Sequence, residues 1–281
     1  MPAATVNGIE LYYEDSGSPD DPALVLINGL GSQMIRWPQG FKDLILAAGF
    51  HLIVFDNRDV GMTQKFADVE TSPAYTVDDM ADDVAALLDH LGIDAAHIVG
   101  QSMGGMIGQV LAIRHPQRVL SLASIMSAMG GDPVSPPDPE VWAIFSEPAA
   151  KTREEAIEQD VRHRRLIAGP GFPFDEDAMR DLATRTYDRC YAPDGRLRQM
   201  LAIQAAPGRA TALADIDIPT VVIHGTADRL VDVESGKRMA DVVPGAELVL
   251  IDGMGHDLPR GAWEPIVEAV VRNTKRATAR T

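Results

Sequence analysis

The stretch "HIVGQSMGGM", residues 97–106, places a single serine between glycines directly after an apolar run. Gly100, Ser102 and Gly104 fit a G-x-S-x-G pattern, with a strand pattern before it and a helix pattern after it. A serine on such a sharp turn is pushed toward positive φ, and side chains two residues away on either side would collide. The stretch is either a plain turn or a strained turn that exposes the Ser102 hydroxyl. Its position after the third internal strand favours the strained turn.

Several other short apolar runs indicate strands that are buried on both faces of a parallel sheet. Segments with helical periodicity lie between them, so the chain predicts a doubly wound α/β sheet. The opening segment, residues 5–17, alternates around Asn7-Gly8 and predicts an antiparallel hairpin at the sheet edge. The other expected strands are 23–29, 51–57, 96–102, 119–127, 220–226 and 246–252, and the expected helices are 41–49, 76–92, 106–116 and 263–275.

The alternation of strands and helices stops between Gly130 and Pro207. A proline-rich stretch, residues 130–140, leaves the sheet, and only helical patterns follow it. We therefore predict an all-helical cap at 131–206, inserted into an α/β core formed by 1–130 and 207–281. The segment "GPGFPFDED" at 169–177 is either a lid hinge or a turn between two cap helices, and we favour the turn. The cap helices are expected at 152–169, 175–190 and 196–206.

Composition limits the function classes. Hydrophobic residues make up 46% of the 281 residues and charged residues 23%, which is typical of soluble globular proteins. The 41 acidic and 25 basic residues give a net charge of −16, which argues against nucleic acid and acidic membrane surfaces as partners. No basic leader with an apolar stretch and no run of about 18 apolar residues is present. We expect a cytoplasmic monomer or homodimer with no membrane partner.

Cofactor and metal patterns are missing from the sequence. Cys190 is the single cysteine, so neither an internal disulfide nor a cysteine-based metal cluster can form. No G-x-G-x-x-G follows the first strand, and there is no Walker sequence or His-x-x-x-His pair. The sequence therefore predicts chemistry without a cofactor or a metal.

The strand–Ser102–helix arrangement resembles the nucleophile turn of the α/β-hydrolase fold family, and the resemblance extends over nearly the whole chain. In that family the nucleophile, the acid and the histidine follow one another in this order along the chain. The stretch "HGTADRLV" (224–231) matches the acid-bearing loop, and "GMGHDLP" (253–259) matches the histidine loop. The resemblance thus implies a catalytic triad of Ser102, Asp228 and His256.

Each residue type suits the chemistry of this triad. A serine hydroxyl is a weak nucleophile until a neighbouring imidazole takes its proton. His256 can accept that proton and later give it to the leaving group. Asp228 would hold the imidazole in the correct tautomer and stabilise its protonated form. Asp232 and Asp252 remain alternatives for the acid.

The loop "INGLGS" at 27–32 lies where the family usually carries His-Gly. Asn28 stands in place of the histidine, which leaves the hydrogen bonding of the loop open. The resemblance implies that the backbone N–H groups of Leu30 and Met103 form the oxyanion hole. Arg58, in a further motif "FDNRDVGMT" (55–63), is interpreted as a structural loop anchor rather than a catalyst.

The predicted substrate pocket is apolar and rich in methionine, a side chain that adapts to irregular shapes. No arginine or lysine is expected to face the triad, so a large neutral or weakly charged ester is favoured over a small acid. The expected pocket wall comprises Leu30, Met34, Trp37, Met103, Met129, Trp142, Ile144, Phe145 and Met254.

The segments "NGLGSQMIRWP", "GQSMGGMIGQ" and "GPGFPFDE", with the motif around Arg58, are similar to those of polyketide methylesterases of the aclacinomycin methylesterase type. This resemblance implies a serine carboxylic-ester hydrolase that works through an acyl-enzyme on macrolide or anthracycline esters or lactones. A cofactor-free perhydrolase or haloperoxidase-like enzyme would use the same triad with peroxide. A non-catalytic ligand-binding protein would have no reason to keep all three triad residues.

Overall fold

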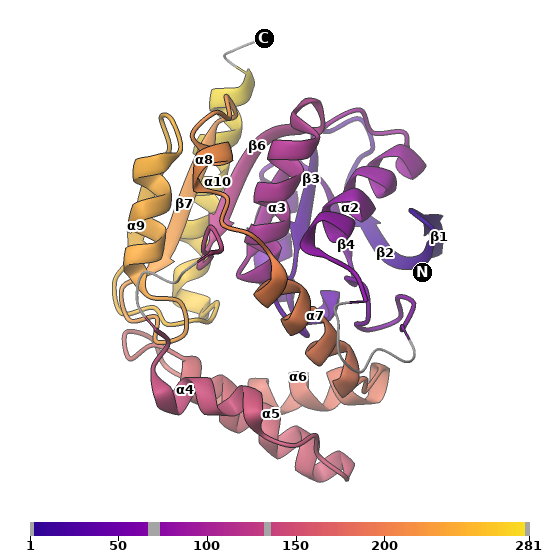
Figure 1. The fold of residues 1–281 in the computed structure, drawn as a ribbon, viewed down its shortest axis with the longest axis vertical. Coiled ribbons are helices and arrows are strands. Elements are labelled where there is room, and N and C mark those ends of the chain that lie inside the picture. The colour runs from indigo at the N-terminus through magenta and orange to yellow at the C-terminus, as the bar shows by residue number, and fades with distance from the viewer. Residues whose placement is uncertain (1–2, 67–73, 132–135, 279–281) are drawn as a thin grey trace.

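The structure is a computed structural model that describes residues 3–66, 74–131 and 136–278. Eight strands form one sheet in the order β1-β2-β4-β3-β5-β6-β7-β8 (Figure 1). β1 and β2 pair antiparallel, β2 also pairs antiparallel with β4, and the remaining pairs are parallel. The strands are β1 (Ala3–Val6), β2 (Ile9–Ser16), β3 (Ala23–Ile27), β4 (His51–Phe55), β5 (Ala96–Gln101), β6 (Val119–Ile125), β7 (Thr220–Gly225) and β8 (Glu247–Ile251).

The two edges of the sheet differ in how well the sequence predicts them. The β1–β2 hairpin is confirmed: Asn7 and Gly8 have φ values of 45° and 78°, as a tight two-residue turn requires. The expectation that β8 is buried on both faces is wrong. Its side chains alternate, and Leu248 and Leu250 are exposed, because this edge strand is covered on one face only.

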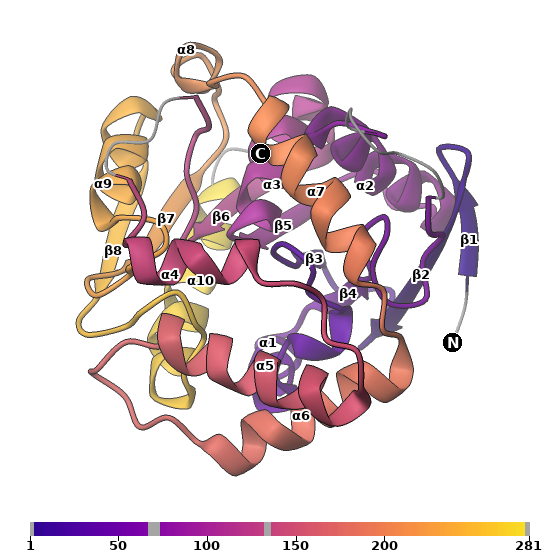
Figure 2. The same ribbon diagram turned by 60° about the horizontal axis from the view of Figure 1, so that its bottom comes forward.

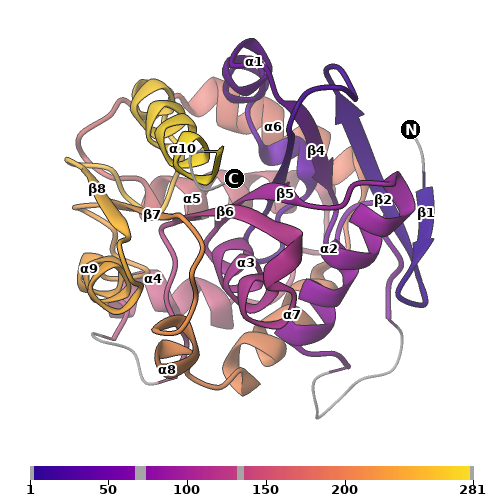
Figure 3. The same ribbon diagram turned by 90° about the horizontal axis from the view of Figure 1, so that it is seen from above.

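Helices cover both faces of the sheet (Figure 3). α1 (Gln39–Ala47) and α10 (Trp263–Thr278) pack on one face, and α2 (Val77–Leu91), α3 (Met103–Arg114) and α9 (Val233–Val242) on the other. The predicted bounds of α2 are confirmed, since Thr76 and Asp79 form a capping box and Gly92 ends the helix at φ 68°. Short 3₁₀ turns are η1 (Met34–Arg36), η2 (Pro116–Arg118), η3 (Ile144–Ser146) and η4 (Arg260–Ala262).

The sequence predicts helices and no strand between β6 and β7, and the described residues there form helices joined by loops. The helices are α4 (Pro139–Ala143), α5 (Arg153–Ile167), α6 (Glu176–Arg189), α7 (Pro193–Ala205) and α8 (Ala210–Leu213). We call α4–α7 the inserted helices; they lie beyond the carboxyl edge of the sheet (Figure 2). α7 begins three residues earlier than expected, because Pro193 is well suited to the first turn. Residues 132–135 of the proline-rich stretch lie outside the described residues.

The parallel strands direct their carboxyl ends toward the inserted helices. The loops after β3, β5, β7 and β8 carry Leu30, Ser102, Asp228 and His256, respectively. Binding sites of open α/β sheets form outside the carboxyl ends of the strands. Among the described helices, none combines the length and the apolar composition needed to cross a membrane.

Candidate active site

Ser102 occupies a strained turn between β5 and α3. Its φ and ψ are 54° and −120°, outside the regions that side chains favour. The Ser102 N–H donates to the Ile125 carbonyl at 2.9 Å, and the Ser102 carbonyl accepts from Gly105 N–H at 2.9 Å. A Cβ at Gly100 would lie 2.1 Å from the Gly104 carbonyl oxygen. The glycines therefore permit a backbone turn in which the serine side chain stands free.

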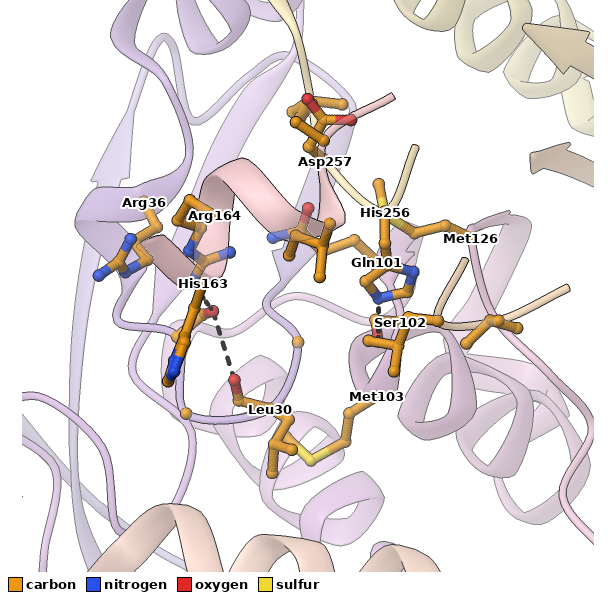
Figure 4. Close-up of a pocket in the computed structure, with 18 of the residues that line it drawn as sticks. Leu30, Arg36, Gln101, Ser102, Met103, Met126, His163, Arg164, His256 and Asp257 are labelled. Atoms are coloured by element: carbon orange, nitrogen blue, oxygen red, sulfur yellow. Dashed lines mark hydrogen bonds between the residues drawn. The ribbon is translucent and has the colours of Figure 1, made fainter. Parts of the chain in front are cut away.

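The structure brings Ser102, Asp228 and His256 together. His256 Nε2 lies 2.9 Å from Ser102 Oγ (Figure 4), and His256 Nδ1 lies 2.7 Å from Asp228 Oδ2. The other carboxylate oxygen, Asp228 Oδ1, accepts from the N–H groups of Leu230 and Val231 at 2.9 Å each. These backbone bonds fix the carboxylate, which in turn orients the imidazole toward the serine.

The two alternative acids have other partners. Asp232 caps the N-terminus of α9 by accepting from Glu234 N–H at 2.8 Å. Asp252 Oδ1 accepts from Thr226 Oγ1 at 3.1 Å. Since neither carboxylate is paired with His256, only Asp228 has the geometry of the orienting acid.

A second histidine, which the sequence analysis did not single out, lies next to Asp228. His224 is fully buried; its Nε2 lies 3.4 Å from Asp228 Oδ2 and donates to the Val231 carbonyl at 2.8 Å. Burial alone raises the pKa of Asp228, but the charge of His256 and hydrogen bonds from His224 and His256 outweigh it. Together they hold the pKa of this carboxyl well below its usual range.

The loop after β3 brings free N–H groups close to the serine. A Cβ at Gly29 would lie 3.2 Å from Ser102 Cβ, a tight contact, so glycine favours this close approach. Gly31 N–H donates to Gln199 Oε1 and Ser32 N–H to the Gly29 carbonyl. The N–H groups of Leu30 and Met103 have no such partner among the described residues. They are therefore available to an oxygen atom bound beside Ser102 Oγ.

Asn28 replaces the usual histidine without loosening the loop. Its Nδ2 donates to the Gln33 carbonyl at 3.0 Å, and its Oδ1 accepts from Gln101 Nε2 at 2.7 Å. Its own carbonyl accepts from Asn57 Nδ2 at 3.0 Å. The fully buried Asn28 amide thus joins the start of the loop to its end at Gln33, and also to Gln101, which precedes Ser102.

Two inserted segments hold the loops that border the serine. Gln199 of α7 bridges Gly31 N–H and the Arg58 carbonyl, at 2.7 Å each. The Ile167 carbonyl at the end of α5 accepts from His256 N–H at 2.8 Å. Sequence reasoning missed both contacts, because a glutamine and a backbone carbonyl carry no motif.

Arg58 has the structural position that the sequence analysis gave it. Its buried guanidinium pairs with Asp83 of α2, with Nη2 2.8 Å from Oδ1, and it lies beneath Phe66 and Tyr75. The neighbouring Asp59, at φ 68°, accepts two hydrogen bonds of 2.8 Å from Arg198 of α7. This motif therefore anchors α2 and α7 and does not face the serine.

A cavity of about 1600 Å³ opens between the carboxyl edge of the sheet and the inserted helices and reaches Ser102 and His256. The expectation for Met34 and Met254 is wrong: neither lines the cavity. Both are buried in the core against α1 and α10, and the Met34 N–H is held by Asp56 Oδ1. The expected residues that do line it are Leu30, Trp37, Met103, Met129, Trp142, Ile144 and Phe145.

The sequence analysis expected no arginine or lysine to face the triad, and it did not predict that cations line other parts of this cavity. Seven arginine and lysine side chains line it with four aspartates, although the whole chain is strongly acidic. Arg36, Arg164 and Arg196 come from η1, α5 and α7. The sequence could not predict this because charged residues on a helix are usually assigned to its solvent face.

No set of three or more histidine, cysteine or acidic side chains in the described part of the chain is arranged to bind a metal ion. The chemistry that this geometry supports is nucleophilic. It combines an exposed hydroxyl, a base within hydrogen-bond distance, an orienting carboxylate and two free N–H donors.

Comparisons with known proteins identify the family of this fold. A family model of the alpha/beta hydrolase fold matches residues 22–259. A rhodomycin D methylesterase of Streptomyces sp. (strain C5) is 32% identical over 294 aligned residues, which cover 98% of each chain. A bifunctional esterase/perhydrolase of Acinetobacter calcoaceticus is 26% identical over 93% of this chain and 95% of its own. A solved esterase of Exiguobacterium antarcticum superimposes with a TM-score of 0.80 at 20% identity, covering 97% and 98% of the two chains.

The chain therefore belongs to the α/β-hydrolase fold family. Within that family it is an ester-hydrolysing enzyme.

Proposed function

We propose that the protein is a serine carboxylic-ester hydrolase that works through an acyl-enzyme formed on Ser102. The observation that carries the proposal is the 2.9 Å contact between His256 Nε2 and Ser102 Oγ in a strained turn. Strained backbone of this kind persists where the surrounding structure enforces it, and it is concentrated at functional sites. In the proposed triad, Asp228 is the acid.

In the first half of the reaction, Ser102 Oγ attacks the ester carbonyl carbon while His256 Nε2 takes the hydroxyl proton. The carbonyl oxygen becomes an oxyanion and accepts hydrogen bonds from the N–H groups of Leu30 and Met103. The intermediate collapses, the alcohol leaves with the proton from His256, and the acyl group stays on Ser102. Asp228 stabilises the imidazolium throughout this step.

In the second half, a water molecule attacks the acyl carbon and gives its proton to His256. The same two N–H groups hold the second oxyanion. Collapse of this intermediate returns the proton to Ser102 Oγ and releases the carboxylic acid.

The proposed substrate is a bulky ester or lactone of polyketide type. A cavity of about 1600 Å³ exceeds the volume of ordinary small-molecule sites, which is roughly 300–1,000 Å³. Aromatic side chains of α4 and η3, Trp142 and Phe145, contribute to its wall. A relative that matches along nearly the full chain is named a rhodomycin D methylesterase. We further propose that residues 131–206 act as the cap that shapes this cavity.

A second candidate is perhydrolysis, in which hydrogen peroxide replaces water in the second half of the reaction and a peracid is released. Perhydrolysis is a candidate because the chain resembles a protein named a bifunctional esterase/perhydrolase. The two reactions share the acyl-enzyme, so they differ only in which nucleophile reaches the acyl carbon.

The proposal is tested by Ser102→Ala. We expect hydrolysis of a p-nitrophenyl ester to fall by about 10⁴-fold or more while the far-ultraviolet circular dichroism spectrum is retained. A fluorophosphonate should label the wild type once, at Ser102, which peptide mass spectrometry can locate. Substantial activity in the variant, or a label at another residue, would contradict the proposal.

Substrate class is tested by incubating polyketide esters, macrolide lactones and short acyl esters with wild type and Ser102→Ala, followed by mass spectrometry. Lactone opening adds one water, and methyl-ester cleavage removes one methylene. Activity confined to short acyl esters would remove the polyketide proposal. Peroxide-dependent bromination faster than any hydrolysis would favour the perhydrolase.

A further inference from the structure

Three arginines lie on one wall of the cavity. Arg36 comes from η1 beside the loop after β3, Arg164 from α5 and Arg196 from α7. Figure 4 shows Arg36 and Arg164 together on one side of the cavity, with Ser102 and His256 on the other. The elements that carry them are far apart in sequence, so the cluster exists only in the folded chain.

The arginines have little negative charge beside them. Arg36 Nη2 lies 2.7 Å from Asp160 Oδ2, which makes one close ion pair. Arg164 shares the same carboxylate at 3.7 Å, beyond hydrogen-bond distance. Arg196 has no carboxylate within 4.0 Å among the described residues; its guanidinium lies over the Phe145 ring, 4.9 Å from the centroid. Arg36 and Arg164 thus share one aspartate, and Arg196 has no ion-pair partner among the described residues.

The remaining neighbours do not neutralise this charge. His163, next to Arg164 on α5, is held at 3.1 Å by Glu147, which also pairs with Arg162. The polar contact of Arg164 toward the loop after β3 is a long one, 3.4 Å from Nη2 to Ser32 Oγ. A guanidinium has five N–H donors, so Arg164 and Arg196 both retain donors that the described residues do not use.

Holding like charges in a partly buried wall is unfavourable. Burial, together with the charges of Arg36 and Arg196, lowers the pKa of Arg164 to about 10, so it is still protonated at neutral pH. Burial likewise lowers the pKa of Arg196, although Asp160 and Glu147 oppose the shift. A bound anion would relieve this repulsion and accept the unused donors.

We propose that Arg164 and Arg196 form a subsite for a carboxylate carried by the ester substrate, away from the bond that is cleaved. Arg36 makes the closest ion pair with Asp160, at 2.7 Å, and Arg164 has the longer contact of 3.7 Å to the same carboxylate. This inference rests on the proposed esterase function and specifies its substrate: an ester with an apolar body and an anionic group at a distance from the reacting carbonyl. It narrows the sequence-based expectation of a large neutral or weakly charged ester to one that carries an anionic group.

The test compares monomethyl esters of linear dicarboxylic acids, from succinate to sebacate, with methyl esters of monocarboxylic acids of the same length. For the wild type we expect kcat/KM to favour the anionic ester by about tenfold at one fitting chain length, mainly through a lower KM. The advantage should shrink as ionic strength rises. In Arg164→Gln/Arg196→Gln it should disappear, while the neutral esters keep most of their rate.

Arg165→Gln is the matched control. Arg165 follows Arg164 on α5, but its exposed guanidinium pairs with Glu176, so removal of this charge should leave the preference unchanged. If the double variant does not fold, Arg196→Gln alone should still lose most of the preference. An equal preference in the wild type and the arginine variants, or none in any of them, would overturn the inference.

A binding measurement on a protein that lacks the proposed nucleophile tests the anionic subsite independently of the proposed hydrolysis. Isothermal titration calorimetry of the Ser102→Ala protein with the fitting half-ester should show binding that Arg164→Gln/Arg196→Gln abolishes. If wild type hydrolyses no ester but this arginine-dependent binding is present, the reaction is wrong and the subsite stands. If esters are hydrolysed but the half-ester binds no better than the neutral ester, the subsite is wrong and the reaction stands.

Discussion

Gln199 of α7 holds Gly31 in place: its side-chain oxygen accepts the Gly31 N–H at 2.7 Å, and its amide nitrogen donates to the Arg58 carbonyl at 2.7 Å. The glutamine is fully buried, so both hydrogen bonds are shielded from water. Gly31 directly follows Leu30, whose N–H is a proposed oxyanion donor. An inserted helix thereby fixes the orientation of a loop that belongs to the sheet.

We predict that Gln199→Leu lowers kcat by about tenfold to a hundredfold, with a smaller change in KM, because a displaced Leu30 N–H stabilises the transition state less well. Steady-state kinetics with a short p-nitrophenyl ester measures the changes in kcat and KM separately. Leu197→Ala, at an exposed position of the same helix, is the control. An unchanged kcat in a folded Gln199→Leu protein would show that Gln199 does not position the loop.

Asp228→Asn should reduce kcat by about 10⁴-fold with little loss of folding, because an amide favours the wrong imidazole tautomer and cannot stabilise its charge. Asp232→Asn should remain near wild type, since asparagine also caps a helix well. Asp252→Asn should likewise remain near wild type. A severe loss in either control, with an active Asp228→Asn protein, would assign the acid elsewhere.

The buried side chain of His97 should make the free energy of unfolding depend on pH. It is buried in β5, its Nδ1 lies 2.9 Å from Ser121 Oγ, and burial lowers its pKa from 6.5 to about 4. Between these values the unfolded chain binds a proton that the folded chain excludes, so the free energy of unfolding falls as pH drops. The loss across this window is on the order of 3 kcal/mol.

Urea unfolding of wild type and His97→Gln at a series of pH values between neutral and about pH 4 measures this contribution. The variant should show a flatter dependence on pH, because it lacks the titrating group. His90→Gln, at an exposed histidine of α2, should keep the wild-type slope. Parallel slopes for wild type and His97→Gln would contradict the prediction.

Substitution of Met34 should affect stability, whereas substitution of Trp142 should affect substrate binding. Met34 is buried in the core, so Met34→Ala should lower the free energy of unfolding by about 2–5 kcal/mol. Trp142 lines the cavity and is 43% exposed, so Trp142→Ala should raise KM for bulky esters with little effect on stability. Denaturant unfolding and kinetics on each variant check both halves. A stability loss in Trp142→Ala as large as in Met34→Ala would contradict the assignment.

The sequence alone determined the fold and the position of the strained turn at Ser102. Buried parallel strands are continuous apolar runs, and the helices between them have a different period, so the alternation is readable over short windows. The turn at Ser102 is also local, since Gly100 and Gly104 are needed within the same few residues. Asp228 and His256 were predicted from the order in which matching loops follow that turn.

The tertiary structure alone decided what surrounds these residues. Which side of η1 faces the cavity is set by packing against α1 and α10, and so Met34 is buried while Arg36 lines the wall. The contact of Gln199 with Gly31 joins residues that are 168 positions apart. In the same way, α5 has no clear apolar pattern to show that Arg164 faces the cavity while Arg165 faces solvent. A sequence pattern encodes the burial of an element, but the neighbours of a polar side chain depend on segments that only folding brings together.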